Sequence, residues 1–241
     1  MSLEKKSQIP LYVQLMKEIK NQIHDGKYKE GQQIPTEKEL SVQYNVSRIT
    51  VRRTIEELCA QGYLIKQQGK GTFVEFPRIY RKLEQDSTMS FTETCSANGR
   101  VPSSHVLSFQ SVPIRPATAE FFSVSPESEV HQIRRVLCAD DLPMILETIY
   151  LPYSKYPDFP KEKLENASFT KLMQEYYGID ETRKGRSTIE VQTASGEMAE
   201  YLQIDPGEPV MILRSYFYDA ENRPLYVSYE VIVGKRYRIS V

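Results

Sequence analysis

Residues 34–74 read IPTEKELSVQYNVSRITVRRTIEELCAQGYLIKQQGKGTFV, and this stretch decides the fold of the first part of the chain. A short helix is predicted to begin after Thr36, because Thr36 can cap it and Glu39, three residues later, completes a capping box. A second helix follows after only Asn45 and Val46. Two short helices separated by so tight a turn indicate a helix-turn-helix.

The second helix is predicted to begin at Ser47, which is another capping residue, and to end near Gly62. Its apolar side chains recur at helical spacing and form one face: Val51, Ile55 and Leu58. The opposite face is polar, so the helix can pack on its own domain and present a second surface outward.

The segments on both sides of the two helices complete the motif. Extended runs are predicted at residues 63–67 and 72–76, and the glycines of the Gly69-Lys70-Gly71 connection favour a hairpin between them. Upstream, residues 10–24 carry an apolar residue at every fourth position and predict a further helix. Residues 1–76 are therefore expected to form a winged helix-turn-helix domain.

The polar face of the second helix has the chemistry that DNA recognition requires. Arg48, Arg52 and Arg53 lie off the apolar stripe, and an arginine can donate two hydrogen bonds to a guanine edge. Ser47 and Thr50 can donate to phosphates at the helix start. The same arginines could instead form a solvated helix face, but the tight turn and the Gly-Lys-Gly hairpin favour DNA.

The net charge of the whole chain is -1, which by itself argues against a nucleic-acid partner. The average conceals an asymmetry, because residues 1–77 hold 12 Lys and Arg against 9 Asp and Glu, whereas residues 78–241 hold 19 against 23. Within residues 45–74 five basic residues face two acidic ones. The charge around the proposed recognition helix and wing is therefore positive.

Residues 77–89 are polar and are expected to form a linker, and residues 90–241 a second domain. Strand-like runs and short helical runs alternate in this second part, which predicts an α+β domain dominated by antiparallel sheet. The expected strands are residues 106–112, 130–138, 143–151, 210–218 and 225–233, and the expected helices are residues 168–177 and 195–202.

Several classes of protein are excluded or disfavoured. Cys59, Cys95 and Cys138 form no metal-ligand spacing, and the histidines are equally scattered, so no metal and no cofactor are predicted. The chain has neither an apolar run long enough to span a bilayer nor a recognisable secretory signal. We therefore expect reduced cysteines, a cytoplasmic location and no membrane partner.

Residues 7–76 closely resemble the winged-helix DNA-binding domain of the GntR family of bacterial transcription regulators. The resemblance rests on residues 9–23, on the block from residue 31 to 64 and on the KQQGKGTFV segment at 66–74. It implies DNA contacts at the matching positions Lys38, Ser47, Arg48, Thr50, Arg52, Gly69 and Lys70. Thr36, Arg53 and Gly71 are added as DNA-binding candidates from their places at the helix start, on the polar face and at the wing.

Residues 90–241 resemble the effector domain of the HutC-type branch of that family, the UTRA domain, which has a chorismate-lyase-like fold. The matching features include SFTE at residues 90–93, the hairpin around residues 134–143, and Leu146-Glu147. The resemblance implies that Ser90, Phe91, Thr92, Arg135 and Ser168 hold a phosphate and that Glu147 binds sugar hydroxyls. A guanidinium, hydroxyls and backbone N–H groups suit a phosphate.

The sequence departs from the relatives at two places in this expected pocket. Leu137 stands where sugar-phosphate-binding members have a second arginine. Those members also have an acidic residue and a tyrosine that align about with Tyr226 and Ile232, and here Tyr229 and Glu230 are the nearby candidates. The expected effector is therefore a different sugar phosphate, a singly charged acid or a neutral sugar.

Each expected pocket residue also has a structural alternative. Arg135 and Glu147 could be exposed strand residues, Ser168 could serve only as a helix cap, and the 90–93 segment could be the entry to a strand. These alternatives stay open at the level of sequence.

The favoured function is a DNA-binding transcription regulator, expected to be a repressor and not an enzyme, whose homodimer binds a palindromic operator under control of a small metabolite. One alternative is a chorismate-lyase-like enzyme fused to a DNA-binding domain. Another is an architectural DNA-binding protein whose second domain ignores ligands. Fold resemblance alone does not carry an enzymatic activity, and no catalytic constellation stands out.

Overall fold

The structure is a computed structural model that describes the chain except residues 1–6, 76–77, 83–88, 181 and 241. The chain divides into two compact units, Met1–Arg78 and Ile79–Val241. Each unit has its own hydrophobic core.

The first unit is a winged helix-turn-helix, as predicted. Its elements are α1 (Leu11–His24), α2 (Glu37–Tyr44), α3 (Arg48–Ala60), β1 (Leu64–Gln67) and β2 (Gly71–Val74). The two strands form an antiparallel hairpin. The apolar stripes that the sequence predicted meet in one core, which includes Leu15, Ile19, Leu40, Val51, Ile55 and Leu58.

The caps at the two short helices also form as predicted. The Thr36 backbone N–H donates to Glu39 Oε2 over 2.7 Å, and Thr36 Oγ1 accepts from the Glu39 backbone, which closes the capping box. Ser47 Oγ accepts from the Thr50 backbone N–H over 3.1 Å. Between the helices Asn45 adopts a left-handed conformation, with φ of 51°, which asparagine tolerates better than most residues. These local interactions fix the turn.

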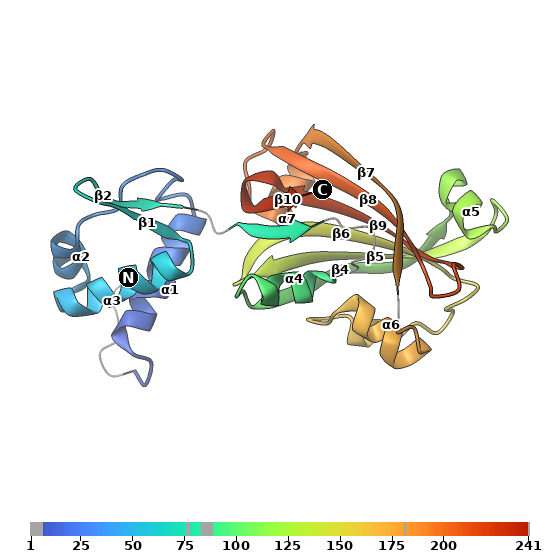
Figure 1. Cartoon of the computed structure of the whole chain (residues 1–241), viewed down its shortest axis with the longest axis horizontal. Coiled ribbons are helices and arrows are strands. Elements are labelled where there is room, and N and C mark those ends of the chain that lie inside the picture. The colour runs from blue at the N-terminus through green and yellow to red at the C-terminus, as the bar shows by residue number, and fades with distance from the viewer. Residues whose placement is uncertain (1–6, 76–77, 83–88, 181, 241) are drawn as a thin grey trace. The chain divides into compact units, whose positions relative to one another are not determined.

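The second unit is built on a six-stranded antiparallel sheet in the order β4-β5-β6-β9-β8-β7 (Figure 1). The strands are β4 (Pro102–Pro113), β5 (Glu129–Ala139), β6 (Leu142–Pro152), β7 (Arg183–Thr193), β8 (Pro209–Tyr218) and β9 (Pro224–Val233). The antiparallel α+β architecture expected from the sequence is confirmed.

Helices cover both faces of this sheet. On one face lie α5 (Pro116–Phe122) and α7 (Gly196–Leu202), packed on the strand residues Val136, Leu146, Val227 and Val231. On the other lies α6 (Phe169–Tyr177), packed on Ile133, Ile149, Phe217 and Tyr226. Since successive side chains of a strand point to opposite faces, each central strand contributes to both cores.

Two small elements join the chain ends of the second unit. β3 (Ile79–Lys82) pairs in parallel with β10 (Tyr237–Ser240), and α4 (Phe91–Ala97) follows β3. Two short 3₁₀ helices, η1 (Lys161–Lys163) and η2 (Gly234–Arg236), complete the unit.

The segment 77–89, expected as a linker, therefore includes a strand of the second unit. Its residue Ile79 is buried whereas Tyr80 is exposed. So short an alternation is hard to recognise in sequence. Residues 77 and 83–88 of the expected linker lie outside the described residues.

Candidate DNA interface and ligand cavity

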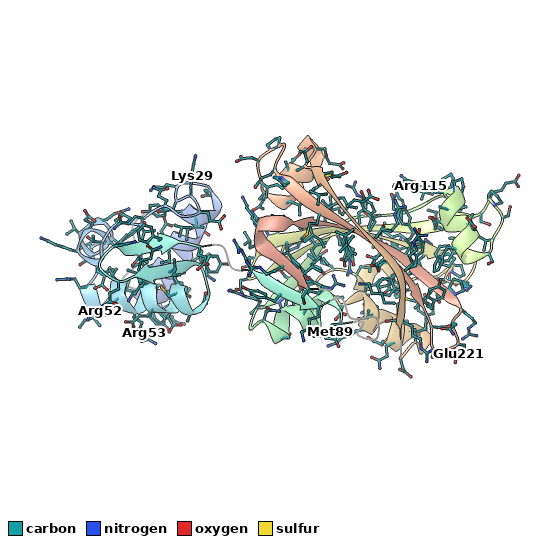
Figure 2. All side chains as sticks on the ribbon, turned by 45° about the horizontal axis from the view of Figure 1, so that its top comes forward. Lys29, Arg52, Arg53, Met89, Arg115 and Glu221 are labelled. Carbon is teal, nitrogen blue, oxygen red and sulfur yellow. The ribbon has the colours of Figure 1, made fainter. Side chains whose placement is uncertain are left out.

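The outward face of α3 presents polar and apolar side chains to solvent. Arg48, Arg52 and Arg53 are exposed, and Ile49 is 80% exposed. The Val51-Ile55-Leu58 face is buried, so the helix has the two-sided character that the sequence predicted. Arg52 and Arg53 reach the surface of the unit (Figure 2).

Two of the α3 arginines have partners within the unit. Arg52 Nη2 lies 3.3 Å from Glu37 Oε2 at the start of α2, and the Arg53 guanidinium lies 3.9 Å from the centre of the Tyr12 ring. Both arginines remain exposed, so these contacts orient the side chains and leave other N–H groups available. Arg48, at the first turn of α3, is among the exposed residues at the helix N-terminus, where base edges are usually contacted.

The predicted phosphate-binding hydroxyls of α3 also serve the helix cap. Ser47 Oγ and Thr50 Oγ1 lie 2.8 Å apart, and Ser47 Oγ accepts the Thr50 backbone N–H. Thr36 and Lys38 are exposed at the start of α2. The N-termini of both helices of the motif are thus capped and accessible.

The tip of the wing depends on two glycines. Gly69 has φ of +73° and Gly71 has φ of +129°, which residues with a side chain rarely adopt. A Cβ at Gly71 would also lie 2.2 Å from Gln33 Nε2, which donates to the Lys70 carbonyl over 3.0 Å. This arrangement holds the exposed Lys70 at the tip of the hairpin.

The second unit contains a cavity of about 430 Å³ beside the α6 face of the sheet. It is bounded by residues of the strands β3 to β9 and by the N-terminal ends of α4 and α6. The predicted effector residues that line it are Ser90, Phe91, Thr92, Arg135, Glu147, Ser168 and Glu230. Leu137, at the position of the relatives' second arginine, lines it as well.

Charged side chains form a paired row across the floor of the cavity. Arg135, Glu147 and Glu230 are register partners on β5, β6 and β9. Arg135 Nε donates to Glu147 Oε2 over 3.0 Å, and Arg135 Nη1 donates to the Ala167 carbonyl over 2.9 Å. Arg81 of β3 pairs with Glu230 over 2.9 Å.

All four charged side chains of these two pairs are largely removed from solvent. Burial raises the pKa of Glu147, and the Arg135 guanidinium opposes that rise. Arg135 and Glu147 are therefore not the exposed strand residues that one reading of the sequence allowed.

The two helices at the cavity differ in how their N-termini are satisfied. At α4, Ser90 and Glu93 form a complete capping box, so the 90–93 segment is a helix start and not a strand entry. At α6, Ser168 makes no side-chain cap hydrogen bond, and its Oγ lies 3.0 Å from Thr170 Oγ1. The first N–H groups of α6 border the cavity and suit an anion.

Tyr229 is the predicted pocket residue that the structure places elsewhere. It packs against the α7 side of the sheet, and the Arg214 guanidinium lies 5.8 Å from the centre of its ring. Strand alternation explains this, because Tyr229 and Glu230 are neighbours on β9 and point to opposite faces. Tyr226 lines the cavity instead and stacks on Phe217 with ring centres 4.4 Å apart.

The sequence analysis also missed charged and polar residues that line the cavity. Arg81 comes from β3, and Lys184 comes from β7. Ser228, between Tyr226 and Glu230 on the same face of β9, is a third. Ser228 could have been predicted from the sequence, because a polar residue in an otherwise apolar strand needs a position where its side chain can form a hydrogen bond.

One unit thus presents a helix-turn-helix surface with a basic wing, and the other encloses a polar cavity. Together they define the class of DNA-binding regulators that carry a ligand domain. Comparison with known families gives two matches. Residues 11–74 match the bacterial regulatory proteins of the gntR family, and residues 97–238 match the UTRA domain. The chain belongs to the GntR family of transcription regulators and carries a UTRA effector domain.

Similar proteins agree with this assignment over nearly the whole chain. The HTH-type transcriptional regulator YurK of Bacillus subtilis (strain 168) is 34% identical over 92% of this chain and 90% of its own length. A protein of Escherichia coli (strain K12) named "Probable fructoselysine utilization operon transcriptional repressor" is 35% identical over 90% and 88%. The crystal structure of PhnF from Mycobacterium smegmatis matches 93% of this chain and 96% of its own with a TM-score of 0.65 and 26% identity.

Among the described residues, no helix is both long and apolar enough to cross a membrane. Nor do they contain a group of three or more His, Cys, Asp or Glu side chains arranged to hold a metal ion.

Proposed function

We propose that this chain is a repressor that binds a palindromic operator as a homodimer and leaves it when a small metabolite enters the cavity of the second unit. The cavity is the observation that carries this proposal, since it brings together residues that are far apart in the sequence. A relative named as a repressor of a sugar-derivative operon supports the sign of the regulation.

The contacts of the DNA are assigned to the helix-turn-helix and the wing. Arg48 reads a base edge, with Ile49 beside it, and Arg52 and Arg53 lie along the same outward face. Lys70 meets the backbone or minor groove from the wing, and Lys38, Thr36, Ser47 and Thr50 contact phosphates. Gly69 and Gly71 allow the close approach.

The ligand is assigned to the class of sugar phosphates and related acids. The phosphate or other acid group would lie against Arg135, Ser168 and the first N–H groups of α6. The sugar hydroxyls would bond Glu147 and Glu230, and the Phe217-Tyr226 stack offers an apolar wall. Losing one arginine to Leu137 is compatible with this class, because the cavity holds Arg81 and Lys184 as further cations.

The ligand can act on the DNA-binding unit through β3, the first element of the second unit in chain order. Asn98, the C-cap of α4, clamps β3 by accepting from the Tyr80 N–H and donating to the Tyr80 carbonyl, both over 3.0 Å. Arg81, the next residue, is tied to Glu230. Both contacts connect β3 to elements that line the cavity. A ligand that displaces Glu230 or α4 therefore changes the contacts that position β3.

Operator binding is tested with the DNA upstream of the chain's own gene and neighbouring genes, labelled and titrated by fluorescence anisotropy. We expect tighter binding to this DNA than to a scrambled control, and release when the correct sugar phosphate or acid is added. Equal affinity for both DNAs would refute sequence-specific regulation. Retained specificity without any metabolite response would favour the ligand-blind alternative.

The enzyme alternative is tested separately, by incubating the protein with chorismate and measuring product. We expect no turnover, because the arginines and glutamates on the floor of the cavity are committed to ion pairs with one another. The cysteines of the described chain are free, which supports a reducing, cytoplasmic location as a part of the proposal.

A further inference from the structure

Lys184 enters the cavity from a strand that is otherwise turned to solvent. β7 is an edge strand of the sheet, and most of its residues are exposed. Lys184 is partly buried and lines the cavity. The long polar side chain of Lys184 is therefore directed into the cavity, although β7 is mostly exposed and does not require a buried side chain there for its own packing.

The backbone of β7 is irregular at this point. Its pairing with β8 shifts register between Lys184 and Ser187, and bulges of this kind re-aim side chains beside functional sites. Gly185 lies within the bulge, where a Cβ would come within 2.4 Å of Tyr218 Cε2. A side chain directly after the lysine would push against the Tyr218 ring, so a glycine suits this position.

Lys184 is a half-buried cation of the cavity without an ion pair of its own. Arg135 is paired with Glu147, and Arg81 is paired with Glu230. Among the described residues, Lys184 Nζ has neither a hydrogen bond nor an ion pair. Burial, and next the nearby Arg81, lower the pKa of Lys184 to about 8, and the attraction of Glu230, which already pairs with Arg81, opposes this only in part.

A second unpartnered group lies on the same floor of the cavity. Ser228 is 4% exposed, lines the cavity, and its Oγ has no hydrogen-bond partner among the described residues. Its register partner Ser215 is already bonded to Ser187 over 3.0 Å. Buried polar groups are normally satisfied, so an orphaned hydroxyl in the same cavity as an ammonium without an ion pair indicates a missing ligand group.

We propose that Lys184 and Ser228 form a second anion subsite, so that the effector carries two acidic groups. The first is held by Arg135 and the N-terminus of α6, and the second, a carboxylate or another phosphate, is held by Lys184 with Ser228 donating to it. This inference rests on the proposed function, because it divides the same cavity between the two ends of one ligand. It narrows the effector class to doubly acidic sugar derivatives.

The test compares three probes on the full chain by isothermal titration and thermal shift. They are 6-phosphogluconate, which has a phosphate and a carboxylate, glucose 6-phosphate, which has only the phosphate, and gluconate, which has only the carboxylate. We expect 6-phosphogluconate to bind at least ten-fold more tightly than either singly acidic probe. In Lys184→Met that advantage should disappear, whereas the affinity for glucose 6-phosphate should stay within two-fold.

Matched variants separate a binding role from a structural one. Lys184→Arg keeps the charge and should keep the preference for the doubly acidic probe. Lys163→Met removes an exposed lysine that does not line the cavity and should change nothing. Circular dichroism of each variant checks the fold.

Two results would overturn the inference. If 6-phosphogluconate binds no better than glucose 6-phosphate, or if Lys184→Met weakens both equally, the second subsite is refuted while the proposed function stands. If none of the three probes binds, the ligand class given under the proposed function fails, and this inference fails with it.

Discussion

Replacing Arg135 by methionine tests how much the buried Arg135–Glu147 ion pair contributes to the stability of the second unit. The change removes the donor to Glu147 Oε2 and to the Ala167 carbonyl while keeping an apolar side chain of similar length. It leaves the Glu147 carboxylate, whose side chain is 11% exposed, without its counter-charge. Breaking a buried pair on one side costs about 3–5 kcal/mol. For a unit of this size that lowers the melting temperature by about 6–20 °C.

The pH dependence of this loss identifies its cause. The pKa of Glu147 is already raised above 4.5 by burial, and removing Arg135 takes away the attraction that opposes the rise. The folded variant therefore holds its proton to higher pH than the unfolded chain does, and its stability falls as the pH rises from about 4.5 through the folded pKa. The destabilisation relative to wild type should be small near pH 5 and largest near pH 8.

The measurement is urea unfolding followed by circular dichroism at pH 5 and pH 8. The double variant Arg135→Met with Glu147→Leu is the control, because it removes both charges and should recover most of the loss at pH 8. Equal destabilisation in the single and double variants, or a loss independent of pH, would refute the ion-pair account. The measured loss of stability must be taken into account when Arg135 variants are tested with an effector, because a lost response could reflect a weakened fold.

The remaining predictions concern the DNA-binding unit. Arg48→Ala should relax base preference at one operator position by about 1–3 kcal/mol, measured by binding to a set of single-base operator variants; unchanged preferences would remove Arg48 from the base edge. Lys70→Ala should weaken all sequences alike and reduce the salt slope by about 1, which anisotropy at several salt concentrations measures. Ser47→Ala removes the cap of α3 and should cost about 1 kcal/mol in urea unfolding, whereas Ser47→Gly should cost less. Gly71→Ala should distort the wing, because its φ and the contact with Gln33 both oppose a Cβ, and weakened DNA binding with unchanged thermal stability would locate the effect.

The winged helix-turn-helix was predictable because local rules determine it. A capping box at Thr36, a left-handed Asn45 and a cap at Ser47 each act within a few residues, and the structure has all three. The sheet of the second unit was predictable in class for a different reason. Its inner strands are long and rich in β-forming residues, whatever their partners.

The elements that were missed lack such signals or carry them weakly. β7, residues 183–193, is mostly polar and exposed, and its apolar residues Ile189 and Val191 alternate with polar ones over too few positions to predict a strand of this length. β3 is a four-residue strand whose existence depends on pairing with β10 at the other end of the chain. α4 is the exception, since Ser90 and Glu93 form a capping box that can be read directly from the sequence. Lys184 and Arg81 could not be assigned to the cavity, because that assignment follows from the missed strands.

Tyr229 was wrongly predicted to line the cavity because of the hydrophobic pattern of β9. β9 is buried on both faces, so its hydrophobic pattern cannot tell which side chains face the cavity. Adjacent residues of a regular strand cannot share a face, so Tyr229 and Glu230 could not both belong to the pocket. A carboxylate inside such a strand requires a partner, which makes Glu230 the better guide to the cavity side. Counting back from Glu230 in steps of two selects Ser228 and Tyr226, and these are the residues that line the cavity.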